Sequence, residues 1–487
     1  MSVARREFLR HFGGAALAPS LAGLVAACSA TDRITASSDP ATARLPRVGR
    51  GFGGYGDLSV SSNCPELLVP SGFTCVKLSE TLAPSRADHG FVVPQAFDGM
   101  AAFPVSNGRV RLVRNHEIRD PVSMAKPLGP SAYDGMAGGG TSTLEVRLVH
   151  GNDGRVSDVE LLEEFVSLSG THVNCAGGPT PWGSWLSCEE TTEGAPQGRL
   201  AEHGYVFEVP AAANGPVQPV PLRAMGRFVH EAIAVDPATG FVYETEDYRY
   251  NPANPAAQPG SGFYRFIPDR NGELTAGGRL QMLAIKGRPS YDSTTGQRPG
   301  LILPVLWVDI DDPDPENAAL DPSAVFRQGL AKGGAIFQRL EGCWYGDGSI
   351  YFNATSGGDA GAGQVWQYRP VGSRQGQLTG STGQLRLIFE SPSFDVLDSP
   401  DNICVSPRGG LVLCEDGDAV QFIRGLTQRG EIFDLVQTNG ELPEFCGATF
   451  SPDGEVLFFN VQGSTSSVGS AKGGTYALWG PWEDGAL

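Results

Sequence analysis

One short pattern recurs six times in this chain: a turn glycine, an alternating apolar strand, and a polar residue where the strand ends. Five of the six copies follow a partner strand and a tight turn, so each is typical of a β-hairpin. Successive turn glycines lie 44 to 108 residues apart, which leaves room for four-stranded blades and inserted loops. These glycines are Gly108, Gly183, Gly240, Gly348, Gly410 and Gly454.

The six copies predict an all-β fold, a six-bladed β-propeller with inserted loops. A β-sandwich also uses hairpins, but it gives no reason for six copies that all end in polar residues. The 65 glycines and 36 prolines among 487 residues supply the many turns that a propeller needs. The formal net charge of −18 argues against a nucleic-acid partner, because phosphate binding needs clustered Lys and Arg. An acidic surface suits calcium better.

The N-terminus resembles an export signal. Arg5 and Arg6 precede a short apolar stretch, as in a twin-arginine (Tat) signal, here residues 1–27. That stretch is too short and too interrupted to predict a membrane span. We therefore expect export through the Tat translocon to the periplasm or the cell exterior.

The residues after this signal predict an anchor and a tether. Cys28 follows three small apolar residues, a pattern typical of a lipoprotein cleavage box, so a lipid on Cys28 would tether the protein to the membrane. The alternative is that Cys28 is a passive residue of a cleaved signal. Residues 28–54 are rich in Ser, Thr, Ala, Pro and Gly, which predicts a flexible tether, and residues 55–487 form the predicted propeller domain.

Eight cysteines follow Cys28, and an exported protein could oxidise some of them. Cys64 with Cys75, and Cys404 with Cys414, are plausible pairs. The chain has no CxxC motif, so the cysteines do not form a zinc-ribbon framework.

In each hairpin, the residues before the first strand and after the second lie at the same end, opposite the turn. If the hairpins line an axis, these polar residues face one central mouth. A set of carboxylates this close would repel, each raising the pKa of its neighbours, and bound cations would relieve that repulsion. The predicted ligands are Asp98, Glu117, Asn174, Cys175, Glu190, Glu231, Glu246, Asp247, Glu341, Asn402 and Glu415, with Asn353 and Asp416 at the same hairpin ends.

Carboxylate and amide oxygens suit Ca²⁺, whereas a thiolate such as Cys175 suits a softer metal, iron or zinc. The sequence thus predicts a mixed-metal cluster. Taken singly, a strand-end glutamate is more often a solvated edge residue, and Cys175 alone is more often a small buried residue. His116 and His230 could be metal ligands, but a structural role in packing is equally plausible for each. Arg339 lies two residues before Glu341, so it could face an anion at the cluster or pair with the glutamates.

Several blocks of this sequence resemble the PhoX-type alkaline phosphatases. They span nearly the whole predicted mature chain in order, and the Asn-Cys and His-Glu blocks are the most specific. They are the Arg5-Arg6 signal, Phe97-Asp98-Gly99-Met100, Asn115-His116-Glu117, Asn174-Cys175, Trp182 to Glu190, His230-Glu231, Arg339-Leu340-Glu341, Ser399 to Asn402, and Cys414-Glu415-Asp416.

The resemblance implies a six-bladed propeller with two oxide-bridged Fe³⁺ ions and three Ca²⁺ ions. It makes Cys175 an iron ligand, Glu190, Glu231 and Glu341 carboxylate ligands, and Arg339 the arginine that contacts phosphate. Arg339, Cys175, Glu231 and Glu341 are then the catalytic set, and Glu117 with the remaining Asn and Asp positions are calcium candidates. The chain is shorter than better-known members, and Glu246-Asp247 ends its third hairpin, so its substrate-contacting loops and metal number are expected to differ.

The leading hypothesis is metal-assisted hydrolysis of small phosphate monoesters by a monomeric enzyme. The second is a phosphodiesterase, phosphotriesterase or lactonase on the same calcium scaffold, since a fold does not fix a substrate. The third is a non-catalytic propeller whose cations join the blades. Activity that needs calcium but no iron would favour the second, and metal-dependent melting without ester hydrolysis would favour the third.

Overall fold

The computed structural model describes residues 54–487, except residues 107, 120–123, 372–381, 441–442 and 465–470. These residues belong to one compact unit that begins at Leu45. The predicted signal, the predicted lipidation site Cys28 and residues 28–53 of the predicted tether lie outside the described residues. No helix in the described ranges is long and apolar enough to cross a membrane.

The prediction of an all-β fold is confirmed. Every named strand pairs antiparallel with its neighbours, and the described helices are short. Those helices are α2 (Ala324–Ala331) and the 3₁₀ turns η1 (Ala195–Gln197), η2 (Arg223–Met225), η3 (Leu274–Ala276) and η4 (Trp482–Asp484).

The first two sheets follow the chain in order. One is β4 (Phe97–Pro104), β5 (Arg109–His116), β6 (Gly139–His150) and β7 (Val156–Thr171). The next is β8 (Asn174–Pro179), β9 (Ser184–Glu189) and β10 (Val206–Pro210).

A nine-stranded sheet joins two such meanders through the pairing of β15 with β19. Its first part is β11 (His230–Val235), β12 (Val242–Glu246), β13 (Phe263–Pro268), β14 (Gly278–Ile285) and β15 (Ile302–Asp309). Its second part is β16 (Leu340–Gly346), β17 (Ser349–Ala354), β18 (Gln364–Pro370) and β19 (Gly383–Glu390).

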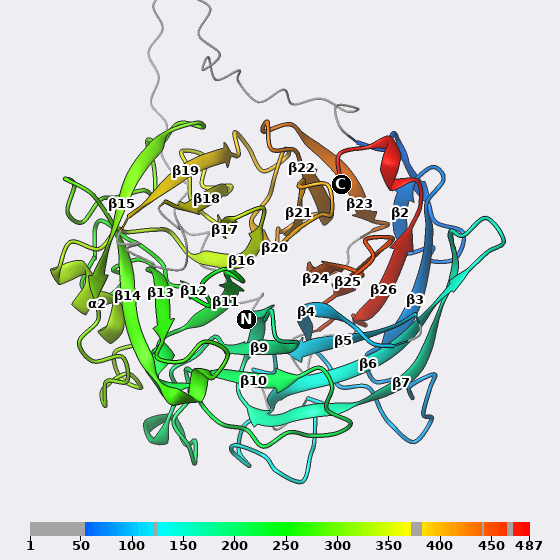
Figure 1. The fold of residues 1–487 in the computed structure, drawn as a ribbon, viewed down its shortest axis with the longest axis horizontal. Coiled ribbons are helices and arrows are strands. Elements are labelled where there is room, and N and C mark those ends of the chain that lie inside the picture. Colours follow the sequence, from blue (N-terminus) through cyan, green and yellow to red (C-terminus); the bar gives the residue numbers. More distant parts are fainter. Residues whose placement is uncertain (1–53, 107, 120–123, 372–381, 441–442, 465–470) are drawn as a thin grey trace, which may run out of the picture. The chain divides into compact units, whose positions relative to one another are not determined.

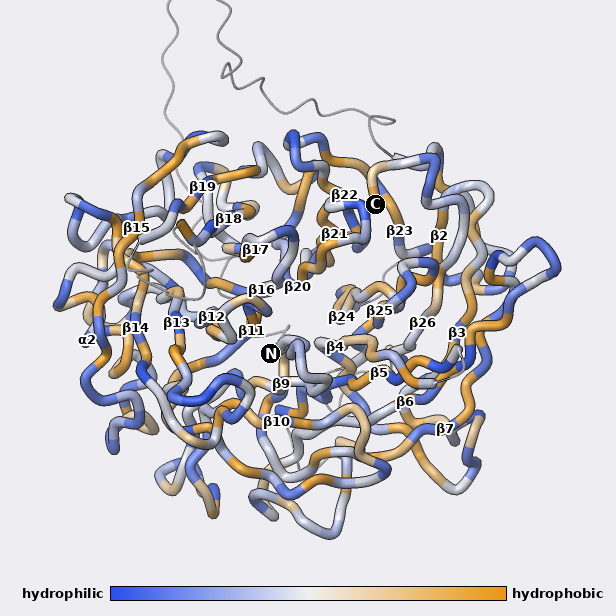
Figure 2. Tube along the Cα trace, in the orientation of Figure 1, coloured by the Kyte–Doolittle hydropathy of each residue, from blue (hydrophilic) through white to orange (hydrophobic). Residues whose placement is uncertain are grey.

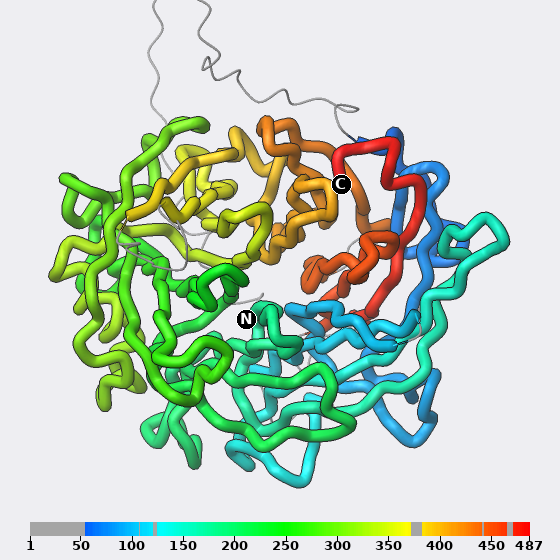
Figure 3. Tube along the Cα trace, viewed as in Figure 1, coloured from blue at the N-terminus to red at the C-terminus, as the bar shows by residue number. Residues whose placement is uncertain are grey.

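The last two sheets combine C-terminal strands with strands from the start of the domain. One is β20 (Pro400–Val405), β21 (Leu411–Glu415), β22 (Phe422–Leu426), β23 (Ile432–Thr438), β2 (Leu67–Pro70) and β1 (Leu58–Val60). The other is β24 (Phe445–Phe450), β25 (Val456–Val461), β26 (Gly474–Trp479) and β3 (Thr74–Glu80). Figure 3 shows blue β3 beside red β26.

The strand that begins each hairpin lies nearest the centre. β4 contacts β8, and the series continues through β11, β16, β20 and β24 back to β4. Figure 1 shows the sheets arranged around this closed series. The strands are largely apolar and pack between neighbouring sheets, while hydrophilic stretches occupy many peripheral loops (Figure 2).

The two ends of the described domain meet. The Tyr55 hydroxyl donates to the carbonyl of Leu487 at 3.1 Å and accepts from its N–H at 3.0 Å. Tyr55 also packs edge-on against Phe73 and Trp482. The C-terminal Leu487 is therefore part of the core.

The cysteines of the described part are eight buried free thiols. Neither expected pair, Cys64 with Cys75 or Cys404 with Cys414, is bonded in this structure. In each case the two thiols lie close enough for one to raise the pKa of the other, in addition to the larger effect of burial.

Candidate metal centre

The same irregularity occurs in all six inner strands. In β4, Phe97 pairs with His116 and Met100 with Arg114, so two residues of β4 oppose one residue of β5. The same two-against-one step recurs in β8, β11, β16, β20 and β24. Each step is a β-bulge, which bends the strand and redirects a side chain.

The first residue of each bulge is a candidate ligand in five of the six strands. These five residues come from five consecutive inner strands, so the repeated backbone step gathers them at the centre. They are Asp98, Cys175, Glu231, Glu341 and Asp401; the sixth position is Gly447. A Cβ on Gly447 would lie 2.5 Å from the Asp98 carbonyl oxygen, so the crowding leaves no room for a side chain there.

A second set of polar residues directly follows the second strand of the hairpins. Glu117 follows β5, Glu190 follows β9, and Asp416 follows β21. The N–H of each donates to a residue just before the inner strand, as Glu117 N–H does to the Ala96 carbonyl at 2.8 Å. This hydrogen bond holds the end of the second strand next to the start of the inner strand. Both sets of residues therefore lie at one end of the sheets.

Together these residues form four linked groups in the described part of the chain. Within each group, one ligand atom from every member lies within 4.8 Å of the others. Three residues, Glu231, Asp401 and Glu444, each belong to two groups and connect the series. The groups are Cys175–Glu190–Glu231, Glu231–Glu341–Asp401, Asp401–Asp416–Glu444 and Asp98–Glu117–Glu444.

Burial and mutual repulsion disfavour the charged form of these carboxyl groups when no cation is bound. Burial raises the pKa of Asp98, Glu231 and Glu341 well above the usual range, and neighbouring carboxylates raise it further. Burial and Asp416 raise the pKa of Glu444 well above its usual range and that of Asp401 to about 7. Bound cations would favour the charged forms.

The Cys175 side chain lies in the same environment. Its Sγ donates to the carbonyls of His230 at 3.3 Å and Glu231 at 3.5 Å. Burial, and then the charges of Glu231 and Glu190, raise the pKa of this thiol well above its usual range. A metal that binds the thiolate would have to displace this proton.

Two arginines pair with the edge of the series. Arg339 forms a two-pronged ion pair with Asp247, at 2.9 and 2.7 Å, and contacts Glu341 at 2.7 Å. Arg119 pairs with both Glu117 and Glu190. Glu190 also adds to the charges that raise the pKa of Arg339, so both guanidinium groups lie near the Glu190 end. Both are partly exposed, at 31% for Arg119 and 15% for Arg339.

Besides Asp247, which pairs with Arg339, four other predicted ligands have hydrogen-bond partners of their own. Glu246 accepts from the Tyr264 hydroxyl at 2.7 Å, and Glu415 from Arg424 at 2.7 Å. Asn174 bonds to Thr171 and Ser187, whereas Asn402 accepts from the Gly447 N–H at 2.6 Å. Asn174, Asn402 and Glu415 are immediate neighbours of residues that reach the centre. Glu246 is the immediate neighbour of Asp247, which lies beside the centre.

The two histidines also lie outside the groups. His116 bonds to the Gln95 carbonyl and the Ser142 hydroxyl, both at 2.8 Å. His230 stacks on Phe228 and contacts Glu244 at 3.4 Å. Both side chains have structural partners.

Sequence reasoning did not single out Asp401, Glu444 or Arg119. Asp401 occupies the bulge position of Cys175 and Glu231, a signal that an alignment of the six hairpins by register would have found. Arg119 and Glu444 lie outside the strands, where no periodicity marks them.

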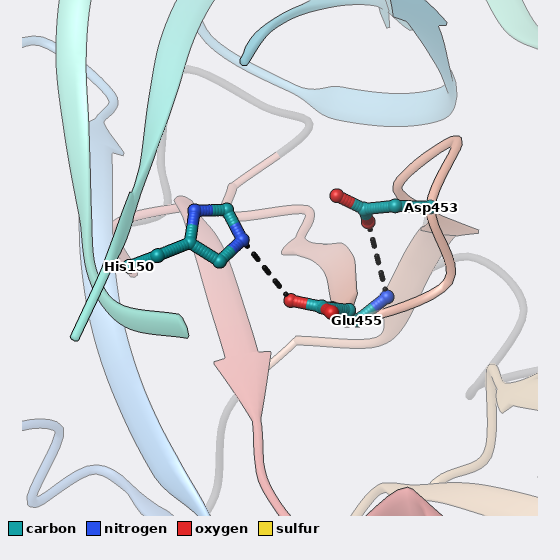
Figure 4. Close-up of side chains that lie close together, drawn as sticks. All are labelled: His150, Asp453 and Glu455. Carbon is teal, nitrogen blue, oxygen red and sulfur yellow. Dashed lines mark hydrogen bonds and ion pairs between the residues drawn. The ribbon is translucent and has the colours of Figure 1, made fainter. Parts of the chain in front are cut away.

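A separate group lies on the surface, where the end of β6 meets the β24–β25 turn (Figure 4). His150 contacts Glu455 at 3.2 Å, and Asp453 accepts from the Glu455 N–H at 3.1 Å. It shares no residue with the four central groups.

The fold and the site define an all-β protein with a central, carboxylate-rich cluster that includes one cysteine and could hold metal ions. Residues 54–464 match the family described as alkaline phosphatase PhoX, and this chain belongs to that family. The family is one of metal-dependent hydrolases.

Pseudomonas fluorescens PhoX, a solved structure, has the same fold. The chain is 17% identical to Pseudomonas fluorescens PhoX, solved with vanadate, a transition-state analogue; the match covers 88% of this chain and 98% of that one, with a TM-score of 0.65. A Xanthomonas campestris gluconolactonase is 14% identical over 88% of this chain and 98% of that one, with a TM-score of 0.43. No curated protein matches the chain.

Proposed function

We propose that this protein is an exported alkaline phosphatase that hydrolyses small phosphate monoesters at a calcium- and iron-containing centre on the axis of a six-bladed propeller. The observation that carries the proposal is the linked series of four ligand groups with two arginines at its edge. The closed series of six inner strands supports the blade count, with the nine-stranded sheet taken as two blades.

The donor atoms of the groups fit the proposed ions. Three groups offer carboxylates, which suit the hard Ca²⁺ ion. The group of Cys175, Glu190 and Glu231 adds one thiolate, which suits iron. Asp98 and Glu231 are buried among other carboxylates, which favours bound cations.

Cations in these groups supply the Lewis acidity that polarises a phosphate ester. Arg339 uses Nε and Nη2 for Asp247 and Glu341, and its Nη1 would donate to phosphate oxygens. Arg119 lies near the same Glu190 end and adds a second positive charge for the transferring group. In the proposed reaction, Asp247 and Glu341 orient Arg339.

We also propose the cellular setting. The twin arginines and the segment before Cys28 support export by the Tat translocon, and a lipid on Cys28 would hold the enzyme at the membrane. Folded export allows iron to be inserted before the protein leaves the cytoplasm. A monomer would suffice, since one chain supplies all nine members of the four groups.

The test combines substrate profiling with metal analysis. The protein, purified after export, is assayed on aryl mono-, di- and triesters of phosphate, and its calcium and iron are measured. We expect monoester hydrolysis with both metals present. Preference for diesters or triesters, or turnover without iron, would refute the proposed substrate or metal set.

Two variants assign the residues. Cys175→Ala should lower both iron content and hydrolysis, and Arg339→Ala should lower hydrolysis with metal retained. The matched controls are Cys404→Ala, another buried cysteine, and Arg270→Ala, an exposed arginine paired with Glu273. Wild-type turnover in both Cys175→Ala and Arg339→Ala would overturn the assignment.

A further inference from the structure

The sixth hairpin is the exception at the centre. Its bulge begins with Gly447, which has no side chain to offer. Its polar strand residue, Asn460, donates to the Asp98 backbone carbonyl at 2.8 Å and accepts from Thr475 at 2.6 Å. Asn460 is therefore used in packing. The hairpin reaches the cluster with Glu444, directly before β24, and with one residue after β25.

That residue is Gln462, which directly follows β25. This hairpin has one additional pair, Phe445 with Val461, so its polar residue falls one position later than in the other hairpins. The Gln462 Nε2 donates to Glu117 Oε2 at 2.8 Å and to Asp98 Oδ2 at 3.3 Å. The side chain is 5% exposed, so these contacts are shielded from water.

The backbone of Gln462 also forms hydrogen bonds at this ligand group. Its N–H donates to the Glu444 carbonyl at 3.1 Å, and its carbonyl accepts from the Phe97 N–H at 3.1 Å, directly before Asp98. Gln462 thus contacts both side chains of the Asp98–Glu117 pair and the backbone of the third member, Glu444. These three residues are the members of one ligand group.

An amide suits this position for a physical reason. Two buried carboxylates repel each other, and an N–H donor aimed at both reduces that repulsion without adding a charge. The same amide carries an oxygen that hard cations bind, and a half-turn about its last side-chain bond exchanges the two atoms.

We propose that Gln462 is a second contribution of the sixth hairpin, beside Glu444, to the metal centre: its N–H groups hold Asp98 and Glu117 together before a cation binds, and its Oε1 binds Ca²⁺ in the Asp98–Glu117–Glu444 group. The inference rests on the proposed calcium centre and not on the ester that is hydrolysed. Calcium binding is therefore its readout, and a failure of monoester hydrolysis would leave the test intact.

The test uses two variants of the chelator-treated full-length protein, titrated with CaCl₂ by calorimetry and by thermal melting. Gln462→Met keeps the length of the side chain but removes both amide atoms. In Gln462→Met, we expect the site that binds calcium most weakly to lose about tenfold or more of its calcium affinity. Gln462→Glu adds a hard oxygen ligand and removes the donor. It should melt lower than wild type without calcium, yet show a larger upward shift on calcium addition.

The matched control is Gln364→Met. Gln364 is also a buried amide that donates to a carboxylate, Glu390, at 2.8 Å, but it lies outside the four groups. It should leave calcium binding unchanged. Wild-type calcium affinity in Gln462→Met, or an unchanged or smaller calcium shift in Gln462→Glu, would overturn the inference and reduce Gln462 to a packing residue.

Discussion

Removing divalent cations should make the stability of this protein fall as pH rises, and Asp401 shows why. Burial and Asp416 raise the pKa of Asp401 from 3.8 to about 7. Between these two values the folded state keeps a proton that the unfolded chain has lost. The folded form therefore gains stability at low pH and loses it as pH rises through about 7.

The size of the effect follows from that shift. About three pKa units at 1.36 kcal/mol each give at most about 4 kcal/mol from Asp401 between pH 4 and pH 8. Asp98, Glu231, Glu341 and Glu444 have pKa values shifted in the same direction. Because these groups share a site, their contributions are coupled and do not simply add.

Urea unfolding of chelator-treated protein at pH 5, 6, 7 and 8 measures this slope. The free energy of unfolding should fall steadily over that range. With calcium in excess the trend should weaken or reverse, because cation binding requires deprotonated carboxylates.

Asp401→Asn separates the contribution of this carboxyl group. It should flatten part of the slope, whereas Asp311→Asn, at a carboxylate with 75% exposure, should leave it unchanged. A stability that is flat or rises from pH 5 to pH 8 without cations would refute the reasoning that the carboxylates repel.

Three further changes test separate parts of the structure. Arg339→Lys keeps the charge but loses the two-pronged contact with Asp247, so aryl phosphate turnover should drop by about a hundredfold. Gly447→Ala should destabilise the fold by about 1–3 kcal/mol in urea unfolding, because φ is 62° and the new Cβ would press on the Asp98 carbonyl. Leu487→Ala removes a buried C-terminal side chain and should cost about 2 kcal/mol or more, seen as a lower melting temperature.

The sequence is sufficient to predict the hairpins because their signals are local. Alternation of apolar residues marks each strand, and Asp, Pro and Gly mark each turn. The common polar end also follows, since both strands of a hairpin bring that end together. Asp98, Cys175, Glu231 and Glu341 were predicted on this basis, and the structure brings them into linked groups.

The choice between neighbouring polar residues does not follow from alternation. At the ends of β12 and β21, the last strand residues Glu246 and Glu415 pair within their own sheets. The next residues differ: Asp416 belongs to a central group, and Asp247 pairs with Arg339 at the edge. In the inner strands the difficulty is different: a bulge adds one residue to the strand and thereby reverses its side-chain alternation beyond that point. A sequence pattern with a period of two cannot locate that step.

The same β-bulge occurs in all six inner strands. It explains why candidate ligands recur regularly around the centre and why the six positions differ in chemistry. Six identical bulges would present six equivalent side chains, so any chemical difference between positions must come from the residue types. The cysteine at Cys175 places the one soft donor beside Glu190, and both arginines lie near that end. At the sixth position Gly447 has no side chain, and this hairpin contributes Glu444 and Gln462 instead. In the proposed function, the thiolate of Cys175 would suit iron, and the carboxylates and the Gln462 amide would suit calcium.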